Sequence, residues 1–120
     1  MMYWLKQKSF MRIDRDRLHL LHIRDAIAKI EEYVQDTTFD EFADQGRTYD
    51  AIMLQFIVIG EAINDLSSQF KEQHAAVPWH KPVGMRNQIA HGYFDVKPDI
   101  VWQTIQENVP ELKKHIEGLV

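Results

Sequence analysis

The stretch "YDAIMLQFIVIGEAINDL", residues 49–66, decides the fold class because its apolar side chains recur every three or four positions. This spacing is typical of a helix, and further apolar residues widen the buried face until most of the helix must be covered. Gln55 and Glu61 interrupt the apolar run at 51–63, which is also shorter than the roughly 20 residues of a membrane span. We therefore expect a central buried helix, or one shared with a partner subunit, and no membrane segment.

The sequence before this stretch predicts two more helices. Residues 14–35 carry a single apolar stripe at spacings of three and four, which indicates a long helix. A brief helix should follow, with Thr38 as its N-cap, Glu41 three residues later in a capping box, and Gly46 as its stop.

The sequence after residue 66 continues the helical pattern. We expect a helix from about Pro78 to His91, where Gly92 supplies a stop. Another helix should open at Pro98 and bend or restart at Pro110. Because no period-two strand pattern appears, the predicted fold class is all-α, an antiparallel bundle of four to five helices.

Length and composition limit the classes of protein that the chain can belong to. Its 120 residues suffice for one domain, which we place at residues 12–120, with residues 1–11 as an N-terminal extension. The chain has no cysteine, which excludes disulfides and thiolate metal sites and fits a cytoplasmic location.

The charge distribution points to a local rather than a general nucleic-acid surface. A formal charge of −4 argues against a protein that coats nucleic acid. Between residues 78 and 97, however, three cationic side chains stand against one carboxylate, Asp95. The net charge of this segment is therefore positive, whereas that of the whole chain is negative.

This basic segment contains "MRNQIAHGYFD", residues 85–95, which holds the candidate functional residues Arg86, Asn87, His91 and Tyr93. An arginine suits a phosphate, with the asparagine as a neutral donor beside it, and a histidine transfers protons near neutral pH. Together they would suffice for metal-free attack on an RNA phosphodiester by its own 2′-OH. On an ideal helix Arg86 and His91 lie about 140° apart, so a site using both favours a two-fold dimer.

For the other notable polar residues, structural roles are favoured over functional ones. Glu61 lies in an apolar stretch and must reach solvent or be paired, and a structural ion pair with Arg86 is favoured over a catalytic role. His19 and His22 have the spacing of metal ligands but no evident third ligand. The acids Asp14 and Asp16 fit a helix start, where they favour the dipole.

The motif Arg86-x4-His91-x-Tyr93 resembles that of HEPN-domain toxins of the HepT type, and the similarity extends over the chain from about residue 12 onward. It includes "RDRLHLLHIRDAIAKIEEY" and "IVWQTIQENVPELKKHI". The resemblance implies a homodimeric helical bundle and an endoribonuclease that needs no metal or cofactor, with Arg86 and His91 as the catalytic pair. It also implies a minimal nucleotidyltransferase antitoxin as partner, which inactivates the toxin by attaching AMP to Tyr93, with higher-order assembly left open.

Two alternatives remain open at this point. The chain could be a non-catalytic HEPN binding module that docks a nucleotidyltransferase and positions its substrate. It could also be a dimeric bundle in which these motif residues are helix surface and helix end.

Overall fold

The structure, a computed structural model, describes residues 2–120, with side chains from Met11 onward. No strand occurs in this range, which confirms the all-α prediction. The elements are α1 (Met2–Val34), α2 (Phe39–Ala43), α3 (Arg47–Asp65), α4 (Ser68–Gln73), α5 (His80–Gly92), the 3-10 turn η1 (Tyr93–Asp95) and α6 (Pro98–Leu119). None of the described helices is long and apolar enough to cross a membrane.

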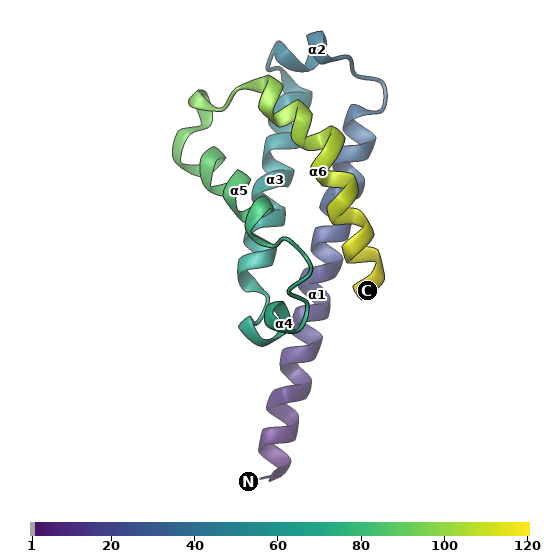
Figure 1. Cartoon of the computed structure of the whole chain (residues 1–120), viewed down its shortest axis with the longest axis vertical. Coiled ribbons are helices and arrows are strands. Elements are labelled where there is room, and N and C mark those ends of the chain that lie inside the picture. Colours follow the sequence, from purple (N-terminus) through teal and green to yellow (C-terminus); the bar gives the residue numbers. More distant parts are fainter. Residues whose placement is uncertain (1) are drawn as a thin grey trace.

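Helix α3 occupies the centre of the bundle, as its sequence predicted. It packs against α1 on one side and α5 on another, while α6 contacts α1 and α2 (Figure 1). The core side chains of α3 include Ile52, Phe56, Ile59 and Ile63, which are almost completely buried. Coverage is not complete, because Leu54 remains 56% exposed. The buried stripe of α1 includes Leu20, Ile23, Ile27 and Ile30.

Helix α1 begins at Met2 and not near Asp14, and its N-terminal end extends beyond the other helices (Figure 1). The interpretation of Asp14 and Asp16 as acids at a helix start was therefore wrong. Asp16 is buried within α1, where its carboxylate accepts hydrogen bonds from the Ser67 N–H at 2.8 Å and the Ser67 hydroxyl at 2.7 Å. Residues 2–11 are the first turns of α1, and the assignment of residues 1–11 as an extension remains a prediction.

The contact with Asp16 also explains the position of helix α4, which was not predicted from the sequence. Ser67 is the N-cap of α4, and its side-chain oxygen accepts a hydrogen bond from the Phe70 N–H at 3.2 Å. This short helix is therefore tied at its start to the middle of α1. Its position depends on a polar contact between residues 51 positions apart, which no local pattern reveals.

The helix boundaries around α2 confirm one prediction and correct another. Thr38 caps α2 by accepting a hydrogen bond from the Glu41 N–H at 3.2 Å, as predicted. Gly46 does not stop α2, because the left-handed conformation is adopted by Gln45, with φ of 56°. Gly46 is instead the N-cap of α3.

Helices α5 and α6 lie where they were predicted, but neither Gly92 nor Pro110 affects the backbone in the way that was expected. Helix α5 ends at Gly92, yet this residue has an extended φ of −157° and the chain continues into the tight turn η1. Helix α6 begins at Pro98 and continues through Pro110 to Leu119 without a restart. Pro110 is exposed, so the backbone carbonyl that its missing N–H would have bonded can reach water.

Candidate active site

Arg86 lies where α5 crosses α3 at a glycine. A Cβ atom added to Gly60 would be 2.2 Å from the Cβ and 2.6 Å from the Cγ of Arg86. Only the hydrogen of glycine leaves room for this approach, so Gly60 determines where the arginine side chain leaves the interface. A role for Gly60 was not predicted from the sequence, although a glycine inside an apolar helix is a recognised signal of close packing.

The guanidinium group of Arg86 is held by two neighbours. One terminal nitrogen, Nη2, donates to Glu61 Oε1 at 3.0 Å, and Nη1 donates to Asn87 Oδ1 at 3.0 Å. The predicted pairing of Glu61 with Arg86 is therefore confirmed. Arg86 is 26% exposed and Glu61 56%, so water screens this ion pair and its main effect is to orient the guanidinium. The Nε atom is buried and has no hydrogen-bond partner among the described residues.

His91 lies in the last turn of α5 and is exposed. Within the described chain, no hydrogen bond or ion pair joins His91 to Arg86. This agrees with their separation of about 140° around an ideal helix. One copy of the chain thus presents an oriented arginine and a free imidazole on different parts of the α5 surface.

Tyr93 points to the start of α3 and not to Arg86. Its hydroxyl donates a hydrogen bond to Asp50, and its ring lies edge-on to Tyr49 with centroids 6.2 Å apart. Desolvation raises the pKa of Tyr93, and the hydrogen bond to Asp50 and the negative charge of that carboxylate raise it further. Asp50 precedes Glu61 by 11 positions, about 16 Å along the axis of α3. The phenol and the guanidinium therefore lie near opposite ends of α3.

Among the described side chains, the two histidines of α1 have no third residue placed to complete a metal site. The rings of His19 and His22 lie 6.0 Å apart, edge to face, in a surface depression that Glu61 and Asp65 also line. Among the residues with described side chains, no group of three His, Cys, Asp or Glu is arranged to hold a metal ion.

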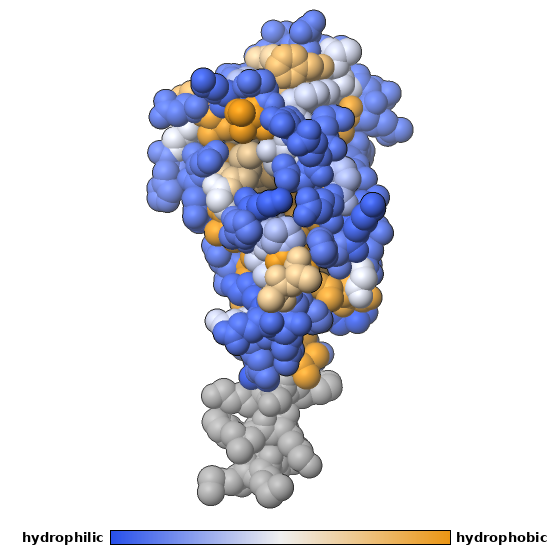
Figure 2. Space-filling model, viewed as in Figure 1, coloured by the Kyte–Doolittle hydropathy of each residue, from blue (hydrophilic) through white to orange (hydrophobic). Residues whose placement is uncertain are grey.

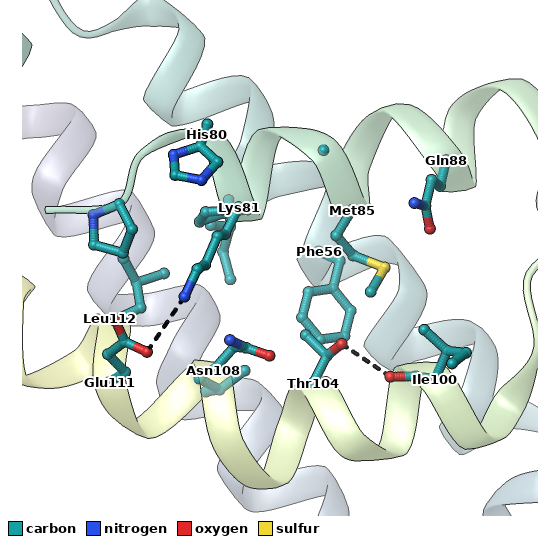
Figure 3. Close-up of a pocket in the computed structure, with 15 residues that line it drawn as sticks. Phe56, His80, Lys81, Met85, Gln88, Ile100, Thr104, Asn108, Glu111 and Leu112 are labelled. Atoms are coloured by element: carbon teal, nitrogen blue, oxygen red, sulfur yellow. Dashed lines mark hydrogen bonds and ion pairs between the residues drawn. The ribbon is translucent and has the colours of Figure 1, made fainter.

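One surface cavity is lined by none of the candidate residues Arg86, Asn87, His91 and Tyr93. It has a volume of about 310 Å³ and opens between α5 and α6, with Phe56 of α3 among its lining residues (Figure 3). Lys81 and Glu111 form an ion pair of 3.9 Å across it. Figure 2 shows apolar side chains reaching the surface where α5 and the start of α6 approach each other.

Comparison with known proteins identifies the family of this chain. Residues 23–119 match the model of a family described as "Ribonuclease HepT-like". The chain belongs to this HepT-like family. Membership confirms the family resemblance seen in the sequence, while the roles of Arg86, His91 and Tyr93 stay predictions.

Relatives within the HepT-like family cover most of the chain. A protein of Thermococcus cleftensis named "Probable ribonuclease HepT" is 34% identical over 101 residues, which span 84% of this chain and 92% of that protein. A protein of Caldanaerobacter subterraneus named as a "Putative RNase" is 34% identical over 104 residues, spanning 87% of this chain and 93% of its own. No solved structure matches the chain.

Proposed function

We propose that this HepT-like chain is the toxin of a toxin–antitoxin pair, an endoribonuclease that cleaves RNA in the cytoplasm without a metal. The observation that carries the proposal is the orientation of Arg86, which the close approach to Gly60 and the bond to Glu61 fix in place. A guanidinium held in one position is suited to stabilise the charge of a transition state, because it needs no reorganisation during the reaction.

The reaction uses the nucleophile that RNA itself supplies. The 2′-oxygen attacks the adjacent phosphorus, the bond from phosphorus to the 5′-oxygen breaks, and a cyclic phosphate and a 5′-hydroxyl result. His91 accepts the proton of the 2′-hydroxyl, and a protonated imidazole returns one to the leaving 5′-oxygen. Arg86 balances the extra negative charge on the pentacoordinate phosphorus.

A homodimer would supply the second imidazole and close the gap between Arg86 and His91. Support comes from the exposed edge of α3, where Leu54 is 56% exposed and Ile57 and Val58 are half-buried. A two-fold contact is self-complementary, so burial of this edge in both copies would bring the two Glu61–Arg86 pairs toward each other.

A nucleotidyltransferase antitoxin would regulate the toxin by attaching AMP to Tyr93. The Tyr93 side chain is only partly buried, and its hydroxyl is held by the exposed Asp50, so an enzyme can reach it. The added nucleotide carries a phosphodiester charge, which would repel RNA from this surface.

The decisive experiment measures RNA cleavage by the purified chain in EDTA. We expect His91→Ala to reduce the rate by roughly 10²–10⁴-fold, the typical contribution of a general acid or base. The matched control is His80→Ala, because His80 is also an exposed histidine of α5 but lies at its other end. Equal rates for wild type and His91→Ala would exclude the proposed catalytic role.

A second candidate function is a non-catalytic module that binds RNA or docks the nucleotidyltransferase. It is favoured by the contacts of Arg86, since Glu61 and Asn87 each accept one N–H from a terminal nitrogen and the remaining N–H groups can still bind a phosphate. This function predicts that RNA shifts on a native gel but stays intact, and that Arg86→Ala weakens the shift while His91→Ala does not.

A further inference from the structure

We propose that Asp50 is the proton acceptor in the modification of Tyr93. When a nucleotidyltransferase transfers AMP to the Tyr93 hydroxyl, the carboxylate of Asp50 takes the proton that this hydroxyl loses. The inference rests on the proposed function and deepens it, because it makes the toxin supply part of the chemistry of its own inactivation.

The geometry places the acceptor at the reacting atom. The Tyr93 hydroxyl already donates its hydrogen to Asp50 Oδ1, a contact between residues 43 positions apart. Asp50 lies in the first turn of α3, where the positive end of the helix dipole favours a negative charge. Asp50 is exposed and Tyr93 is half-buried, so an incoming nucleotide can approach this pair from the solvent side.

Tyr49 holds the phenol ring against this acceptor. The ring of Tyr49 is buried and meets the Tyr93 ring at 85°, so Tyr93 is supported from the side of the core. The Tyr49 hydroxyl is buried without a hydrogen-bond partner among the described residues and does not compete for Asp50. The next acid along the chain, Asp95, has its carboxylate turned toward Gly92, and no described bond joins it to Tyr93. Among the described carboxylates, the structure therefore singles out Asp50.

The chemistry of AMP transfer requires such an acceptor. A tyrosine hydroxyl is protonated at neutral pH because its ordinary pKa is about 10, and the pKa of Tyr93 is raised above this value, so the attacking phenol must lose its proton as the new bond forms. The Tyr93 oxygen bonds to the α-phosphorus of ATP, the bond from that phosphorus to the bridging oxygen of the β-phosphate breaks, and pyrophosphate leaves. The proton passes to Asp50, as the substrate hydroxyl of a protein kinase gives its proton to a catalytic aspartate.

The test compares AMP transfer to variants of the full chain. Each variant is mixed with the cognate nucleotidyltransferase, ATP and Mg²⁺, and the added AMP mass is followed by intact mass spectrometry at saturating concentrations of the chain. Asp50→Asn keeps the size and a hydrogen-bond acceptor but cannot take a proton. Asp65→Asn is the matched control, since it removes the same charge from an exposed carboxylate of the same helix. Tyr93→Phe removes the hydroxyl to which AMP would be attached.

We expect Asp50→Asn to reduce the maximal rate of transfer by about 100-fold or more while Asp65→Asn matches wild type. Asp50→Glu, which restores a carboxylate, should recover part of the rate, and circular dichroism should show that all variants are folded. Equal rates for Asp50→Asn and Asp65→Asn, with wild type modified and Tyr93→Phe not, would overturn the role of Asp50 alone. Absence of AMP on wild type, or equal addition to Tyr93→Phe, would overturn the proposed modification and this inference with it.

Discussion

The two ends of α3 hold functional residues in different ways. At one end Arg86 packs directly on Gly60, and its guanidinium bonds to Glu61. At the other end, beyond the last turn of α5, Tyr93 is held by a hydrogen bond to Asp50 and by the edge of the Tyr49 ring. Backbone packing fixes the first residue, whereas side-chain contacts alone hold the second.

This difference matches the two functions that we propose. A residue that stabilises a transition state gains from a fixed position, because movement would cost free energy during the reaction. A residue that is modified must instead be released, since AMP on the Tyr93 oxygen removes the hydrogen that bonds to Asp50. The phosphodiester charge would also be repelled by that carboxylate, which favours movement of the modified side chain away from α3.

The contact at Gly60 should be the most sensitive to substitution. We expect Gly60→Ala to lower the free energy of unfolding by about 1–3 kcal/mol, because the new methyl group overlaps the Cβ of Arg86 and forces α5 to shift. Denaturant unfolding measures this loss, and RNA cleavage should fall with it, because the shift displaces the guanidinium.

Gly84 provides the control for this prediction within α5. A Cβ at Gly84 meets no atom within 4 Å, so Gly84→Ala should raise the free energy of unfolding by roughly 0.5–1 kcal/mol through its better helix propensity. If Gly60→Ala and Gly84→Ala had the same effect, the close approach of α5 to α3 would not exist in solution.

The ion pair at the same end should contribute less than the packing. In a double-mutant cycle, we expect Arg86→Ala and Glu61→Ala to show a coupling energy of about 0.2–1 kcal/mol, because Glu61 is 56% exposed and water screens the pair. Thermal unfolding of the four proteins gives this value. A coupling near 3 kcal/mol would instead indicate that a partner subunit buries the pair.

The Tyr93 end should show its effect in the dependence of stability on pH. Because the folded pKa of Tyr93 is raised above the unfolded value of about 10, its contribution to stability is fully present below about pH 10 and is lost as the pH rises through the folded pKa. Tyr93→Phe should lower the free energy of unfolding by about 0.5 kcal/mol near neutral pH. The difference from wild type should shrink at alkaline pH, and a constant difference would contradict the bond to Asp50.

The sequence could predict one of these two ends better than the other. The pairing of Glu61 with Arg86 followed from the rule that a carboxylate in an apolar helix needs solvent or a partner. The bond between Tyr93 and Asp50 depends on how α5 runs back along α3, which residues 43 positions apart do not reveal. The same holds for Gly60, since which side chain faces a glycine is set by the approach of two helices. Local patterns thus predicted the helices, but contacts between them needed the structure.

The smallest effect on the free energy of unfolding should come from substitution of the exposed residues His91 and Phe94, which lie on either side of Tyr93 in the sequence. Phe94 is 95% exposed, and its contact with the Tyr93 ring, edge-on with centroids 5.5 Å apart, leaves most of its surface in water. We expect Phe94→Ala and His91→Ala to change the free energy of unfolding by less than about 0.5 kcal/mol, measured by denaturant unfolding at low protein concentration. An unfolding free energy that depends on protein concentration, and a larger loss in either variant at high concentration, would mean that a second copy covers this surface. His91 would then lie inside the dimer interface, beside the partner's copy of the motif, and not at its solvent-exposed rim.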